Sequence, residues 1–162
     1  YKKSLLPNSK FILEYKPLNL LSLNVGSSII SFNHPNFKSW RDNRQGIQYS
    51  IPSSNITVTG RLDDFWFDIK SRKLIVVEYK TTSRKKKVAS EVELSLRYKR
   101  QVEIYQWLLR KNGFQVSKLS YFVFCNAKKD LDAFKCRLNF DISIIPYQGN
   151  DSWVESKIRA AG

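Results

Sequence analysis

The alternation of apolar and polar residues sharpens abruptly at Gly46. Before it, the first 45 residues mix basic, apolar and small polar side chains with little periodicity, and Pro35 interrupts any helix there. A short helix is expected after Pro35, with Asn36 as its N-cap and Gly46 as its stop. Beyond Gly46, alternation and short apolar runs predict strands at residues 47–51, 56–67, 74–80, 118–125 and 134–145.

One long helix is predicted between the third and fourth of these strands. Ser90 with Glu93 three residues later is a capping box that opens the helix, and Asn112-Gly113 is a typical C-terminal signal. Apolar residues recur every three to four positions and form one stripe, which comprises Leu94, Tyr98, Val102, Tyr105, Leu108 and Leu109. A last short helix is expected after Asp151, through Ile158.

The order of these elements predicts a mixed α/β fold. Residues 56–67 and 74–80 are joined by a polar turn and are expected to pair as an antiparallel hairpin, and the second strand is apolar enough to lie centrally in a sheet. We therefore expect a central four- to five-stranded mixed sheet flanked by helices. At 162 residues one domain suffices, with residues 1–45 packing on a core formed by residues 46–162.

The charge of the chain indicates the kind of partner it binds. Lys and Arg number 28 against 14 Asp and Glu, so the formal net charge is +14. Such a surface attracts polyanions through phosphate contacts and counterion release. Because the positive charge is spread along the chain and is not gathered on one amphipathic helix, nucleic acid is favoured over an anionic membrane.

The short apolar runs and the small number of cysteines indicate the cellular location of the protein and exclude some metal sites. No run is long enough to cross a bilayer and no secretory signal opens the chain, so a cytoplasmic protein is expected, associated with the nucleoid in a bacterium or archaeon. The absence of Met predicts that the chain is part of a larger protein. Cys125 and Cys136 are expected to be buried free thiols, and with one histidine they cannot supply a four-ligand zinc or iron–sulfur site.

Candidate chemistry begins with an acid and a base on one strand. Side chains alternate faces along a strand, so Glu78 and Lys80 point the same way, about 7 Å apart along the chain. In an antiparallel hairpin Asp63 is expected near Glu78, and two adjacent carboxylates repel unless a cation lies between them. A hard divalent ion such as Mg²⁺ or Mn²⁺ suits these ligands. Gly60 is expected to allow a close backbone approach or a bulge where a phosphate enters.

The long helix and the loop before it add polar and basic groups. Gln101 and Tyr105 are four residues apart, hence on one face, with Arg97 a turn earlier. Such groups donate hydrogen bonds to phosphate oxygens. The side chains expected to contact nucleic acid are Arg84, Lys85, Lys86, Lys87, Arg97 and Arg100.

Three motifs follow one another along the chain: Gly60-x-x-Asp63, Glu78-x-Lys80 and Gln101-x-x-x-Tyr105. In this order the sequence resembles the PD-(D/E)xK nuclease superfamily, and specifically its RecB-like branch, whose motifs are GxxD, (D/E)xK and QxxxY. The resemblance extends more loosely over residues 40–147. It implies a restriction-endonuclease-like core around the three motifs.

The same resemblance implies roles for the motif residues. Asp63 and Glu78 are similar to the metal-binding acids, Lys80 to the catalytic lysine, and Gln101 and Tyr105 to the residues that hold DNA and shape the site. The implied activity is that of an Mg²⁺- or Mn²⁺-dependent deoxyribonuclease, in which a metal-positioned water hydrolyses a phosphodiester of double- or single-stranded DNA. DNA repair, recombination or defence are the implied settings.

Two features depart from the pattern of the RecB-like branch. Its members often carry another metal ligand, a Glu or His, on a helix before the hairpin, and this chain offers His34, Asp42 or Glu14, of which His34 is the candidate metal ligand. Several members also carry four cysteines for an iron–sulfur cluster, which this chain lacks.

Other readings of the same residues stay open. Glu78 and Lys80 also fit an ordinary salt bridge at a strand end, and Gln101 and Tyr105 fit a polar rim and a core aromatic. A nucleic-acid-binding domain of the same fold with weak or no catalysis is the first alternative function. A Holliday junction resolvase or restriction-type endonuclease is the second, and the QxxxY motif argues against it.

Overall fold

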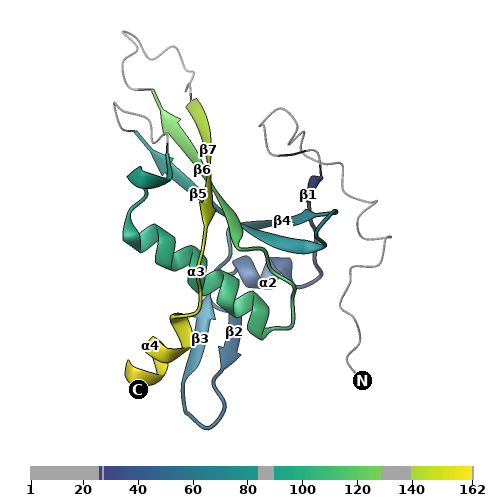
Figure 1. Cartoon of the computed structure of the whole chain (residues 1–162), viewed down its shortest axis with the longest axis vertical. Helices are drawn as coiled ribbons and strands as arrows, with labels where there is room; N and C mark the ends of the chain where they lie inside the picture. Colours follow the sequence, from purple (N-terminus) through teal and green to yellow (C-terminus); the bar gives the residue numbers. More distant parts are fainter. Residues whose placement is uncertain (1–25, 27, 84–89, 129–139, 162) are drawn as a thin grey trace.

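A five-stranded mixed sheet forms the centre of the molecule. The computed structural model describes residues 26, 28–83, 90–128 and 140–161 of the chain. The strand order is β1-β4-β5-β6-β7, with β5 and β6 parallel and the other pairs antiparallel (Figure 1). The strands are β1 (Ile29–Ser31), β4 (Asp64–Asp68), β5 (Lys73–Thr82), β6 (Leu119–Ala127) and β7 (Phe140–Gln148). The predicted mixed sheet and the β4–β5 hairpin are confirmed.

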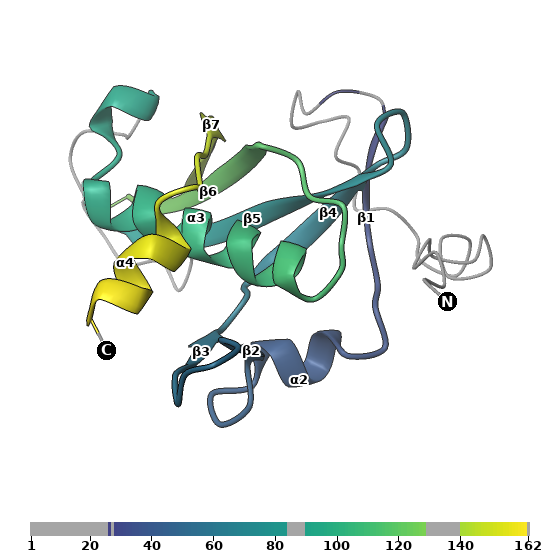
Figure 2. The same cartoon turned by 60° about the horizontal axis from the view of Figure 1, so that its bottom comes forward.

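The single strand predicted over residues 56–67 is wrong, because the chain changes sheets within it. Strand β3 (Thr57–Gly60) pairs with β2 (Ile47–Ser50) in a separate two-stranded sheet, whereas β4 joins the main sheet. Between them the amide of Leu62 donates to the carbonyl of Trp40 at 3.2 Å, a contact with the segment before β2. Figure 2 shows the β2–β3 hairpin set apart from the main sheet, beside α2.

The long helix α3 (Leu96–Lys111) crosses one face of the sheet (Figure 2). It begins later than predicted: Ser95 is the N-cap, and its Oγ accepts from the amide of Tyr98 at 3.3 Å. The segment opened by Ser90 is a separate short 3-10 helix, η2 (Glu91–Glu93), and the Ser90 side chain makes no capping bond. The predicted C-terminus is confirmed, because α3 ends at Asn112 and Gly113 follows with φ 89°.

Two shorter helices complete the described elements. Helix α2 (Phe37–Arg41) has Asn36 at its N-cap position as predicted, although the Asn36 side chain makes no capping hydrogen bond. The predicted stop at Gly46 is wrong, because the helix ends at Arg41 with Asp42 as its C-cap. Helix α4 (Val154–Ala161) lies beside α3 (Figure 1). In the described parts of the chain every helix is too short or too polar to span a bilayer.

The sheet separates two apolar clusters. The larger one contains the buried side chains of α2, α3 and α4, together with Phe65, Val76 and Phe122 from the strands. The smaller one lies on the other face and consists of Trp66, Ile75, Val77, Tyr121 and Val123. Since Val76 faces α3, the alternation along β5 places Glu78 and Lys80 on the same face as that helix.

Some predictions fall partly or wholly outside the described residues. The basic loop with Arg84, Lys85, Lys86 and Lys87, the start of the last predicted strand at 134–139, Glu14 and Cys136 all lie there. Cys125 is a free thiol, as expected, but it is half-buried at the end of β6 and not fully enclosed.

Candidate active site

Strand β5 carries both Glu78 and Lys80. Its apolar half is almost completely buried between β4 and β6, and Glu78, the next residue, is only 2% exposed. Asp64 pairs with Val77, so the antiparallel register places Asp63 beside Glu78. The hairpin therefore sets two carboxylates side by side on the face covered by α3.

The two oxygens of the Glu78 carboxylate have different surroundings. Oε1 accepts from the Lys80 Nζ at 2.6 Å and from the Gln101 Nε2 at 2.7 Å. Oε2 is buried and has no hydrogen-bond partner. A buried carboxylate oxygen without a donor is costly unless another group, such as a proton or a cation, satisfies it.

Asp63 supplies the neighbouring negative charge. Its Oδ2 accepts from the backbone amide of Tyr79 at 3.0 Å, which fixes the carboxylate against β5. Burial and the charge of Asp63 raise the pKa of Glu78 to about 7, although the hydrogen bond from Lys80 opposes this shift. The pair thus favours binding of a positive species between the carboxylates.

Helix α3 covers the site with the side chains of Gln101 and Tyr105. The Gln101 Nε2 donates to the Tyr105 hydroxyl at 2.9 Å, and the Lys80 Nζ donates to the Gln101 Oε1 at 3.2 Å. Burial raises the pKa of Tyr105, so its hydroxyl keeps its proton. The second and third sequence motifs therefore meet, because Glu78, Lys80, Gln101 and Tyr105 form one continuous set of hydrogen bonds.

Gly60 allows α3 to approach the site. A Cβ at this position would lie 2.6 Å from the Leu108 Cδ1 and 3.0 Å from the Tyr105 ring. The glycine thus makes room for the helix, which differs from the sequence expectation that it makes room for an incoming phosphate. The first and third motifs are in direct contact through this packing.

The residues present fit a hard divalent cation. Glu78, whose Oε2 has no partner, lies beside the Asp63 carboxylate, and carboxylate oxygens are the ligands that Mg²⁺ and Mn²⁺ prefer. Within the described ranges no three His, Cys, Asp or Glu side chains gather in a metal-binding group. Two carboxylates with further oxygens from water and substrate phosphate are a common arrangement for Mg²⁺.

His34 and Asp42, the candidate third ligands within the described residues, have contacts close to α2. The His34 ring stacks on Trp40 at 4.6 Å and its Nδ1 accepts from the Asn36 amide. Burial lowers the pKa of His34, which favours the neutral imidazole. The Asp42 Oδ1 accepts from the backbone amide of Arg44. Both side chains thus have local partners around α2.

Arg97 and Arg100, the two basic residues of α3 expected to contact nucleic acid, are exposed. Arg97 lies one turn before Gln101 and is open to solvent. The guanidinium of Arg100 lies over the Trp153 ring, 5.7 Å from its centroid, on the side toward α4. Arg97 therefore stays a candidate phosphate contact beside the site, whereas Arg100 already has a partner.

Two further contacts at the site were not predicted from the sequence. The Lys80 Nζ lies 4.6 Å from the centroid of the Tyr98 ring, although Tyr98 was assigned only to the apolar stripe. On the opposite face of the hairpin the Tyr79 hydroxyl donates to the Asp64 Oδ2 at 2.8 Å. The position of Tyr98 three residues before Gln101 is the sequence signal for the first contact.

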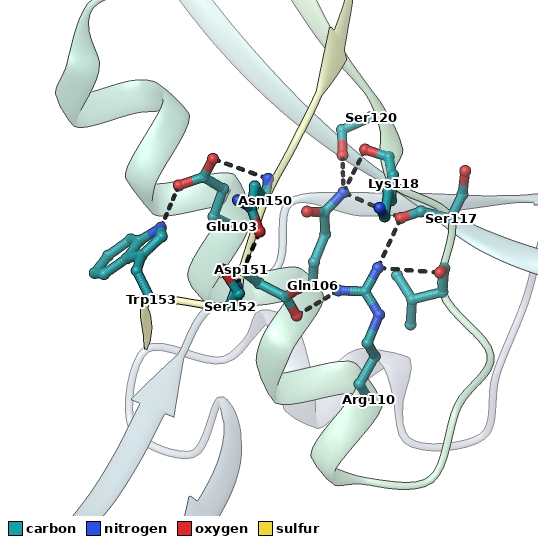
Figure 3. A network of polar contacts seen from close by, with 11 residues as sticks. Glu103, Gln106, Arg110, Ser117, Lys118, Ser120, Asn150, Asp151, Ser152 and Trp153 are labelled. Carbon is teal, nitrogen blue, oxygen red and sulfur yellow. Dashed lines mark hydrogen bonds and ion pairs between the residues drawn. The ribbon is translucent and has the colours of Figure 1, made fainter. Parts of the chain in front are cut away.

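A buried polar network anchors the other side of α3 (Figure 3). The Gln106 Nε2 lies within hydrogen-bond distance of the Ser117 and Lys118 carbonyls and the Ser120 Oγ. Arg110 binds Asp151 and two carbonyls of the segment before β6. At 100° per residue this side is roughly opposite Gln101, so the network fixes the rotation of the helix that presents Gln101 and Tyr105.

The raised pKa of Glu78 predicts a pH-dependent stability in EDTA. Between pH 4.5 and about 7 the folded protein keeps the Glu78 proton that the unfolded chain releases, so the free energy of unfolding falls as pH rises through this range. At about 1.4 kcal/mol per pKa unit, the loss of stability over this range amounts to about 3 kcal/mol. Glu78→Gln mimics the protonated acid and should flatten this part of the profile.

Urea unfolding at several pH values, followed by circular dichroism, measures the effect. The difference between wild type and Glu78→Gln isolates Glu78 from the other titrating groups. Parallel profiles for the two proteins would contradict the shifted pKa.

Adjacent carboxylates, an amine and an amide above a mixed sheet define a centre suited to metal-assisted cleavage of phosphate esters. The family model of the PD-(D/E)XK nuclease superfamily matches residues 20–154, and the chain belongs to this superfamily. Its members are generally nucleases that use divalent metals, which makes nucleic acid the class of substrate. No curated protein and no solved structure gives a match to the chain.

Proposed function

We propose that this protein is a RecB-like, metal-dependent deoxyribonuclease that hydrolyses phosphodiester bonds in the cytoplasm during DNA repair, recombination or defence. The observation that supports it most is the convergence of Glu78, Lys80 and Gln101, with one buried Glu78 oxygen left without a donor. An ordinary strand-end salt bridge accounts for Oε1 only, and the buried Oε2 needs a proton or a cation in addition.

Asp63 and Glu78 would hold the cation, Mg²⁺ or Mn²⁺. When bound, such an ion supplies Lewis-acid polarisation of the phosphate and a lowered pKa of coordinated water. Gln101 supports this role indirectly: with Lys80 it occupies the Glu78 Oε1, which leaves Oε2 as the oxygen without a donor. In this proposal the Glu78 Oε1 binds Lys80 and Gln101, and the Glu78 Oε2 binds the cation.

Lys80 is the group that acts on substrate in this proposal. Its ammonium lies beside Glu78 on a side chain 17% exposed, where it can orient the attacking water and offset the negative charge that develops on the phosphate. The Tyr105 hydroxyl, held by Gln101, remains a neutral donor for a phosphate oxygen.

The RecB-like assignment is supported by contacts between motifs. Gly60 packs against Tyr105, and Tyr105 is held by Gln101, which in turn binds Glu78. These residues serve one site, which favours the RecB-like branch over a resolvase or restriction-type enzyme that shares only the acids and the lysine. The net charge of +14 supports DNA as the polyanion.

A cleavage assay tests the proposal. Purified protein is incubated with linear and circular DNA, single- and double-stranded, in Mg²⁺, Mn²⁺ or EDTA, with RNA of the same sequence in parallel. We expect DNA fragments only with a divalent ion, and none from Asp63→Asn. Asp68→Asn is the matched control, because Asp68 is the last residue of β4, at the other end of the strand from Asp63, and is bonded to Ser71. DNA binding without cleavage would instead support a catalytically inactive binding domain.

A further inference from the structure

The ammonium of Lys80 is held from two directions. On one side it donates to the Glu78 Oε1 at 2.6 Å and the Gln101 Oε1 at 3.2 Å. On another, it lies 4.6 Å from the centroid of the Tyr98 ring, within the range of a cation–π interaction. The two oxygens bind the ammonium by hydrogen bonds, whereas the ring attracts it through its π face.

Tyr98 is itself fixed by the helix and by the sheet. The Ser95 Oγ accepts from the Tyr98 amide, so the N-cap of α3 sets where this residue lies on the helix. The ring packs near Phe122 and Phe124 of β6, with centroids 6.4 Å and 6.5 Å away. In the parallel β5–β6 pair Phe124 is opposite Lys80, so Tyr98 lies over a strand neighbour of the lysine.

We propose that Tyr98 is a positioning residue for Lys80, whose ring face keeps the ammonium beside Glu78 and away from bulk solvent. Lysine has a long flexible side chain and a strongly hydrated charge, so two hydrogen bonds alone leave much of its conformational freedom. The proposal rests on the nuclease function proposed above. Tyr98 acts through Lys80 and not on the substrate.

Two substitutions of Tyr98 separate the effect of its aromatic ring from the effects of side-chain size and of the hydroxyl. Tyr98→Leu keeps an apolar side chain but removes the π face, and we expect its kcat to fall about tenfold at unchanged KM, the size of a partly desolvated cation–π contact. Tyr98→Phe keeps the ring and should match wild type in kcat. DNA affinity in EDTA should be equal for all three proteins.

A control variant tests whether any loss of a tyrosine ring has this effect. Tyr49 is also half-buried and has Lys111 over its ring at 5.5 Å, but it lies on β2, outside the set of hydrogen bonds around Glu78. Tyr49→Leu should keep the wild-type kcat. A tenfold loss in this variant as well would overturn the specific role of Tyr98.

A second readout does not depend on cleavage. In protein labelled with ¹³C-lysine, ring currents from Tyr98 should shift the ε-methylene protons of Lys80 upfield in wild type and Tyr98→Phe. The signal should return to the ordinary lysine position in Tyr98→Leu, and Lys80→Arg assigns it by its loss. An unshifted Lys80 signal in wild type would overturn the contact.

The two readouts distinguish the two proposals. If wild type cleaves DNA and Tyr98→Leu cleaves equally fast, the role of Tyr98 is overturned and the nuclease function stands. If wild type does not cleave, the nuclease function is overturned, and the hold of Tyr98 on Lys80 is judged by the lysine signal alone. Equal losses in Tyr98→Phe and Tyr98→Leu would also overturn the inference, because the hydroxyl would then be the active part.

Discussion

Replacing Lys80 with alanine is expected to lower the rate of DNA cleavage about a thousandfold, within the range for loss of a group that assists proton transfer or stabilises developing charge. The ammonium is the one cationic group bonded to Glu78 within the described residues, so its loss leaves the developing charge uncompensated. DNA affinity should change little, because it arises from many phosphate contacts over a chain of net charge +14.

Single-turnover cleavage in Mg²⁺ and Mn²⁺, with DNA binding measured in EDTA, separates these two effects. Lys70→Ala is the matched control, since Lys70 is an exposed lysine in the turn between β4 and β5. Metal-dependent cleavage that persists in Lys80→Ala at near the wild-type rate would remove Lys80 from the mechanism.

Replacing Glu103 with alanine is expected to produce the largest loss of stability among single substitutions proposed here. This buried carboxylate on α3 accepts from the Tyr147 hydroxyl at 2.6 Å, the Asn150 amide at 3.0 Å and the Trp153 Nε1 at 2.6 Å. Figure 3 shows the last two of these contacts. Alanine leaves three donors without an acceptor, at a cost of about 4 kcal/mol in the free energy of unfolding.

Urea unfolding followed by circular dichroism measures this cost. Glu103→Gln keeps one acceptor oxygen and should lose about half as much. Glu155→Ala serves as the control: Glu155 is partly exposed on α4 and pairs with Lys111 and Arg159, so its removal should cost little free energy of unfolding. A loss for Glu103→Ala no larger than the loss for Glu155→Ala would contradict a structural role for this carboxylate.

The sequence was informative where local pattern and final structure agree. Glu78 and Lys80 lie on one face because strand alternation has a fixed period, and the apolar run before them made β5 central. The sequence also placed Asp63 near Glu78, since a short turn leaves the hairpin few registers. The observed register of β4 and β5, with Asp64 opposite Val77, supports this position of Asp63.

The features that differ from the sequence prediction are those in which a tertiary contact determines the local structure. Leu62 continues the alternation of Ile56 and Val58, so the pattern up to this residue does not mark the break that its bond to Trp40 stabilises. The Ser90 and Glu93 pattern was equally ambiguous, because a short 3-10 turn satisfies it as well as a helix does. The contact between Tyr98 and Lys80 depends on the position of α3 over the sheet, which no periodicity defines.

The anchoring of α3 has a consequence for anyone who shortens or transplants this domain. All the motif residues lie between Gly60 and Tyr105, yet the helix that carries two of them is tied down by Asn150, Asp151 and Trp153 near the C-terminus. A fragment that ends just after Tyr105 would keep all three motifs. It would lose the C-terminal residues that hold α3 in its position over the sheet. Boundaries for expression or grafting should therefore extend through α4.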